Sequence, residues 1–151
     1  MLNAGVRIDD FTLPDENGSP FSLSEYEGKT VIIYFYPRDN TPGCTKEACS
    51  FRDEYDEILE TGAVVIGISP DSPESHRTFK QEHDLPFTLL SDPEKKIIRR
   101  FDSLGEKDLM GDMAEKIYRS TYIVDEDRII RKVFHKVNPE GHGREILSFL
   151  L

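Results

Sequence analysis

The sequence lacks long hydrophobic runs. No stretch of apolar residues reaches the roughly 20 positions that a bilayer-spanning helix needs. The first ten residues, MLNAGVRIDD, also lack the apolar centre of a secretory signal peptide. We therefore expect no membrane partner and a cytoplasmic location.

The chain has fewer basic residues than acidic ones. The chain has 19 lysines and arginines against 29 aspartates and glutamates, so its net charge is −10. No segment gathers the basic residues into a stripe, and an acidic surface repels the phosphate backbone of DNA or RNA. We expect no nucleic-acid partner.

Cysteines are few as well: the chain has two, Cys44 and Cys49. A small secreted domain stapled by disulfides usually has more, and a bridge across so short a gap constrains little of the unfolded chain. In a reducing cytoplasm, two close cysteines are more often catalytic or metal-binding than structural.

The 151 residues suit one domain, spanning 1–151, because no repeat, low-complexity tract or flexible linker divides them. A β-hairpin is expected around Asn17 and Gly18. Strands are then predicted at 30–36, 63–69, 87–90, 118–124 and 128–134, and helices at 43–59, 72–83, 93–101 and 143–151. This order predicts an α/β fold with a central mixed sheet and helices on both faces. A thioredoxin-like arrangement fits it, and so do other three-layer α/β arrangements.

The segment Thr41-Pro42-Gly43-Cys44 follows a buried strand and opens a helix. Threonine is a good N-cap and proline favours the first helical position, so Cys44 is predicted at the third. Free backbone N–H groups and the helix dipole favour an anion there. Because the thiolate is the nucleophilic form of cysteine, Cys44 stands where it would be activated.

The two cysteines also have simpler interpretations. Cys44 shares a helical stripe with Ala48 and Phe51, so it could be a small core residue, and Cys49 could be a residue without a role. If they act together, their spacing matters. Residues five apart in a regular helix lie about 8.7 Å apart at Cα, whereas a disulfide needs about 7 Å or less. Such a pair can bond only after the helix unwinds locally.

Zinc binding is the other common use of paired cysteines. No second cysteine pair and no closely spaced histidine pair follows, since the histidines at 76, 83, 135 and 142 form pairs seven apart. We expect no metal and interpret the four histidines as surface or loop residues. A thiolate would also need a cation beside it; Arg38 and Arg119 are both candidates, and spacing does not choose between them.

Residues 34–49, YFYPRDNTPGCTKEAC, resemble the active-site segment of the peroxiredoxins, and most closely that of the peroxiredoxin Q or bacterioferritin comigratory protein subfamily. The family motif is matched by Pro37, Thr41 and Cys44, and the subfamily's second cysteine by Cys49. Further matches are VVIGIS, FTLLSD at 87–92, LGEKDLMG at 104–111 and RSTYIVD at 119–125, so the resemblance covers nearly the whole chain. One departure is Leu104, where relatives often have a large aromatic residue.

The resemblance implies a role for each matched residue. Cys44 would be the peroxidatic cysteine and Cys49 the resolving one. Thr41 would hydrogen-bond the peroxide and Pro37 would shield the pocket from water. Arg119 would stabilise the charge on the thiolate and the peroxide. Glu47 would orient that arginine.

The implied activity is the reduction of hydrogen peroxide and organic hydroperoxides through a sulfenic acid and an intramolecular disulfide. Thioredoxin or a similar dithiol protein would restore the thiols, no cofactor would be needed, and the protein would be a monomer or weak homodimer. The alternative is a peroxide-sensing redox switch that relays oxidation to a partner protein. A general thiol–disulfide oxidoreductase is disfavoured by the cysteine spacing.

Overall fold

The computed structural model of the protein describes residues 2–105 and 116–151. Its centre is a sheet with strand order β5-β4-β3-β6-β7. The strands are β3 (Thr30–Phe35), β4 (Ala63–Ser69), β5 (Thr88–Ser91), β6 (Ser120–Val124) and β7 (Ile130–His135). Strand β4 pairs in parallel with β3 and β5, whereas β6 pairs antiparallel with β3 and β7. The predicted mixed sheet is confirmed.

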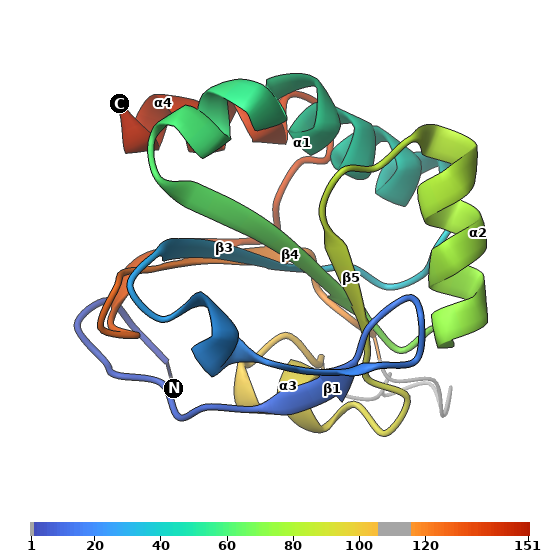
Figure 1. The fold of residues 1–151 in the computed structure, drawn as a ribbon, viewed down its shortest axis with the longest axis horizontal. Helices are drawn as coiled ribbons and strands as arrows, with labels where there is room; N and C mark the ends of the chain where they lie inside the picture. Colours follow the sequence, from blue (N-terminus) through green and yellow to red (C-terminus); the bar gives the residue numbers. More distant parts are fainter. Residues whose placement is uncertain (1, 106–115) are drawn as a thin grey trace.

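Helices cover both faces of this sheet (Figure 1). They are α1 (Pro42–Glu60), α2 (Pro73–His83), α3 (Lys96–Arg100) and α4 (His142–Leu150). Helices α1 and α4 pack together on one face, and α3 lies on the other with the N-terminal strands (Figure 1). Within the described ranges, no helix is both long and apolar enough to cross a membrane.

Strand β3 separates two apolar clusters. Val31, Ile33 and Phe35 belong to the cluster on the α3 side, while Ile32 and Tyr34 belong to the cluster beneath α1. Successive side chains of a strand point to opposite faces, so a strand covered on both faces must be apolar throughout. The run of apolar residues had predicted this, and it makes β3 a rigid base for the loop that follows.

The N-terminal hairpin is also present. Strand β1 (Thr12–Pro14) pairs antiparallel with β2 (Pro20–Ser22), and a short 3-10 helix, η1 (Leu23–Tyr26), follows. Gly18 has a φ of +77° in the connecting turn, a conformation that glycine adopts without strain.

One boundary differs clearly from the prediction, because α3 begins at Lys96 instead of near Pro93. The Asp92 carboxylate accepts hydrogen bonds from the N–H groups of Lys96 at 3.1 Å and Ile97 at 2.9 Å. Lys95 has a left-handed φ of 59°, so the chain turns before the helix starts and Asp92 caps it from a distance. The ends of the other predicted helices and of the sheet strands lie within two residues of those observed.

Candidate active site

The site begins where α1 begins. Thr41 has an extended backbone (φ −85°, ψ 154°) and is the N-cap, and Pro42 occupies the first helical position. Thr41 Oγ1 accepts a hydrogen bond from the N–H of Cys44 over 3.3 Å, and its hydroxyl donates to the Arg38 carbonyl over 3.3 Å. Cys44 therefore stands at the third helical position, as predicted, where the helix terminus favours an anion.

Cys44 is both a core residue and the neighbour of a charged group. Only 1% of it is exposed, and it lies in the apolar cluster beneath α1 with Tyr34 and Phe51. The guanidinium of Arg119 lies close enough to Cys44 to interact with it electrostatically. Burial lowers the pKa of Arg119, but attraction and hydrogen bonding to Cys44, helped by Glu47, raise it above the ordinary arginine value.

The register of the sheet explains how Arg119 reaches this point. Strand β6 runs antiparallel to β3, with Ser120 opposite Phe35. Arg119 comes immediately before Ser120, so it lies beside the end of β3, where the loop toward α1 starts. The two segments are adjacent only because the sheet pairs them, which is why sequence spacing could not choose this arginine.

Gly43 is a residue of the site whose role the sequence analysis missed. A Cβ atom added at Gly43 would lie 2.7 Å from Arg119 Nη2, so the guanidinium rests directly on the backbone of the first helical turn. Glycine inside a helix costs about 1 kcal/mol relative to alanine. A glycine in this unfavourable position was the sequence signal that another group approaches the helix backbone closely.

Glu47 is the second charged residue of the site. Its Oε1 lies 3.2 Å from Arg119 Nη1, and its side chain is fully buried, while 18% of the Arg119 side chain is exposed. Burial raises the pKa of Glu47 to about 7, although the charge and hydrogen bond of Arg119 oppose this. Glu47 lies one helical turn after Cys44, so both residues face the same guanidinium.

The remaining predicted residues lie around this group. Pro37 is half-buried and directly follows the buried Tyr36, whereas Arg38 is exposed. Cys49 is half-buried, further along α1, and both cysteines are free. Helix α1 is uninterrupted between them. They are five residues apart, which in a regular helix corresponds to about 8.7 Å between their Cα atoms.

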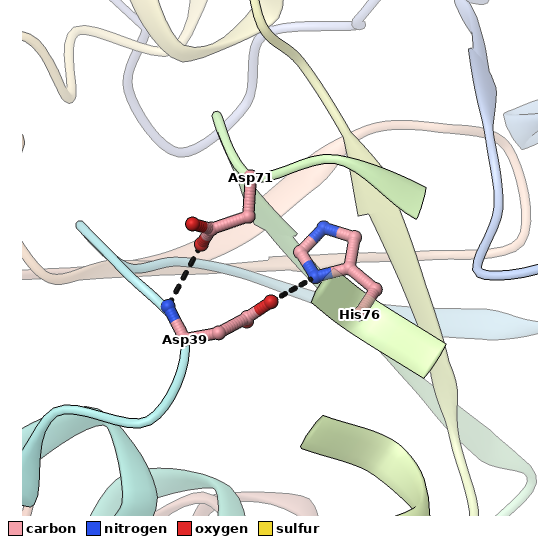
Figure 2. A group of neighbouring side chains, drawn as sticks. All are labelled: Asp39, Asp71 and His76. Carbon is pink, nitrogen blue, oxygen red and sulfur yellow. Dashed lines mark hydrogen bonds and ion pairs between the residues drawn. The ribbon is translucent and has the colours of Figure 1, made fainter. Parts of the chain in front are cut away.

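The histidine prediction is wrong for two of the four residues. His76 in α2 has 0% and His142 at the start of α4 has 1% of its surface exposed. His142 contacts the Thr121 hydroxyl at 2.7 Å and Glu145 at 2.8 Å. His76 lies beside Asp39 and Asp71 (Figure 2). One possible ligand atom from each of these three residues lies within 4.8 Å of the others, so this is the group in the described chain that could be considered for a metal.

Leu104, the departure from the family pattern, is half-buried and packs against the cluster on the α3 side. It forms an isolated antiparallel bridge with Ile117. Most of the matched segment LGEKDLMG lies outside the described residues.

Comparison with known proteins agrees with this geometry. The profile of the AhpC/TSA family matches residues 4–133. The chain belongs to this family. It is 43% identical over 149 residues to the putative peroxiredoxin bcp of Coxiella burnetii, covering 99% of both chains. It is 42% identical over 149 residues to peroxiredoxin Bcp of Bacillus subtilis, covering 99% of this chain and 95% of the relative.

Solved structures give the same result. The bacterioferritin comigratory protein of Xanthomonas campestris superposes with a TM-score of 0.88 at 33% identity, covering 93% of this chain and 89% of that one. A cysteine-to-serine mutant of PrxQ from Xylella fastidiosa has a TM-score of 0.93 at 28% identity, covering 99% and 96%. The fold is therefore the thioredoxin-like fold of the peroxiredoxins. The family implies peroxidase function, a peroxide substrate and a thiol reductant.

Proposed function

We propose that Cys44 attacks the peroxide, that Cys49 resolves the product as a disulfide, and that thioredoxin recycles the pair. The observation that carries this proposal is the position of Arg119. Its guanidinium lies close to Cys44 at the start of α1 and pairs with the buried Glu47. A cation and the positive end of the α1 dipole then meet near one sulfur, and both favour its thiolate form.

In the first step the Cys44 thiolate attacks the outer oxygen of the hydroperoxide. An S–O bond forms as the O–O bond breaks, so sulfur loses two electrons and the oxygens gain them. The departing oxygen takes a proton and leaves as water or an alcohol. Arg119 stabilises the negative charge on both the thiolate and the departing oxygen, while the Thr41 hydroxyl hydrogen-bonds the peroxide.

In the second step the sulfur of Cys49 attacks the sulfenic acid of Cys44. An S–S bond forms and water leaves with the proton of Cys49. The first turns of α1 must open for this, because the intact helix keeps the two residues too far apart. Opening is expected to stop before Ser50, since Gly143 of α4 packs against the Ser50 backbone and donates to its hydroxyl.

Recycling requires an external dithiol, and thioredoxin is the proposed one, in a reducing cytoplasm. The substrate range includes organic hydroperoxides as well as hydrogen peroxide. The Xanthomonas relative supports this range, since an alkyl peroxide reduction activity is described for that protein.

The test is peroxide-dependent consumption of reduced thioredoxin. Cys44→Ser is expected to abolish it. Cys49→Ser is expected to consume one equivalent of peroxide, to leave a sulfenic acid on Cys44 that a dione reagent traps for mass spectrometry, and to lose recycling by thioredoxin. Robust turnover by Cys44→Ser would contradict the assignment of the nucleophile. Normal recycling by Cys49→Ser would contradict the assignment of the resolving thiol.

The alternative function, a redox switch, is separated by the same assay. A sensor needs only slow turnover with thioredoxin and transfers its oxidation to a partner protein. Many rapid turnovers per molecule with thioredoxin as sole reductant would favour the peroxidase.

A further inference from the structure

A buried network holds the loop between β3 and α1. Asp39 lies in this loop, and only 2% of its side chain is exposed. Its carboxylate accepts hydrogen bonds from the Tyr36 hydroxyl at 2.6 Å and the Ser75 hydroxyl at 2.7 Å, and His76 Nδ1 lies 2.8 Å away. The backbone N–H of Asp39 donates to Asp71 at 2.7 Å. Figure 2 shows the Asp39 side chain directed at the imidazole and its backbone nitrogen at Asp71.

The hydrogen bonds of His76 show which of its ring nitrogens carries a hydrogen. His76 Nε2 lies 2.9 Å from the Leu90 carbonyl, which can only accept, so Nε2 carries a hydrogen. Nδ1 faces an Asp39 carboxylate oxygen that also accepts from Ser75. His76 and Asp39 thus form a hydrogen-bonded pair in which the two side chains are 0% and 2% exposed.

The nitrogen and oxygen atoms of this group are also possible metal ligands. However, both nitrogens of His76 already point at oxygen acceptors, and both oxygens of Asp39 already receive hydroxyl donors. The hydrogen bonds account for the whole arrangement, which therefore acts as a lock between elements and not as a ligand set.

The lock sits directly before the reactive helix. A single residue separates Asp39 from Thr41, and this residue, Asn40, has a left-handed φ of 59°. Tyr36, on the other side, stacks on Tyr34 with ring centroids 5.3 Å apart, within the cluster that contains Cys44. Where Asp39 is held thus determines where the N-cap of α1 lies.

We propose that the Asp39–His76 pair is a positioning device for the peroxide reaction. It anchors the loop to α2 and β5, so that the turns of α1 that open for the disulfide refold each time onto a fixed N-cap. The inference rests on the proposed function, since it assumes attack by Cys44. Neither residue touches the sulfur; both act through Thr41.

Two substitutions of one residue separate positioning from packing. In a Cys49→Ser parent, which isolates the first attack, His76→Asn keeps an amide donor near Nδ1 for Asp39. His76→Gln keeps one near Nε2 for Leu90 and loses the link to Asp39. Asparagine leaves the larger cavity, so a purely structural histidine would make it the worse variant.

The measurement is the single-turnover rate of peroxide reaction at Cys44, by competition with a haem peroxidase. We expect His76→Gln to be slower by about tenfold or more and His76→Asn to stay within about threefold, since small misplacements of reacting groups cost this much. His142→Gln, at a buried histidine of α4, is the matched control and should react at the parent's rate. Equal rates for the two His76 variants, or a slower Asn variant, would overturn the inference.

Two further outcomes are decisive. A parent that does not consume peroxide would overturn the proposed function and the inference with it, whereas a reactive parent with unaffected His76 variants would overturn the inference alone. Should the His76 variants not fold, Ser75→Ala carries the test, because it removes one donor to Asp39 and little volume. It should slow attack about threefold, while Ser72→Ala, the N-cap of the same helix, should not; equal rates for the two would refute the lock.

Discussion

Two pairs of ionisable side chains flank the start of α1, and they differ in how far they are exposed to solvent. The Asp39–His76 pair is sealed, and hydroxyl groups satisfy its carboxylate. In the Glu47–Arg119 pair, the carboxylate is fully buried but 18% of the arginine side chain is exposed, beside Cys44. Under the proposed function, the enclosed pair would hold a loop and the partly exposed pair would stabilise the sulfur of Cys44. The same kind of interaction would then support two different tasks.

The largest expected effect concerns Glu47 and protein stability. Its pKa is raised from 4.5 to about 7 in the folded protein, so the folded state binds more protons than the unfolded state between these values. The contribution of Glu47 to stability should therefore fall as pH rises from 4.5 to about 7, by about 3 kcal/mol, since each pH unit is worth about 1.4 kcal/mol. In Glu47→Gln this fall should be absent.

Urea unfolding followed by circular dichroism at several pH values measures this difference. Glu57→Gln, at an exposed position of α1, is the control and should keep the parent's pH dependence. A Glu47→Gln variant whose stability falls with pH as the parent's does would show that Glu47 is not the buried acid described above.

Arg119→Lys should slow the first attack by about 100-fold, since losing one preorganised donor to a developing charge typically costs this much. Lysine keeps the charge but cannot contact Cys44 and Glu47 in the same fork. Single-turnover peroxide kinetics measure the rate, with the exposed Arg38→Lys as the matched control. Equal losses in the two variants would contradict the distinction between the arginines.

Gly43→Ala tests the close approach of Arg119 with a smaller change. The new methyl group would lie 2.7 Å from Nη2 and push the guanidinium away from Cys44, so attack should slow by about tenfold. Helix propensity favours alanine, so the melting temperature should not fall for that reason. A Gly43→Ala variant that is as fast as the parent would mean that this contact is not needed.

The sequence predicted those features of the structure that depend on residues close together in the chain. The Thr41-Pro42 cap, the helix through Cys44 and the buried β3 follow from capping preferences and periodicity. Arg119 was chosen only by family resemblance, because its position depends on the pairing of β6 with β3. His76 was misjudged because a polar residue on a helix is usually exposed, and its partner Asp39 comes from a distant loop.

The α3 boundary was missed for a related reason. Asp92 caps that helix over an intervening left-handed residue, and a cap at this separation leaves no fixed spacing in the sequence. Local sequence patterns do not predict caps separated from their helix by intervening residues, nor contacts between elements that are distant in the chain.

The central claim is that the Cys44–Cys49 disulfide and the first turns of α1 exclude one another. Hydrogen exchange measured by mass spectrometry on the reduced protein, and on protein oxidised with one equivalent of peroxide, tests it directly. Backbone amides of residues 45–49 should be protected when reduced and exchange rapidly once the disulfide has formed, while residues 51–60 stay protected in both. A disulfide that forms with unchanged protection at 45–49 would contradict the account.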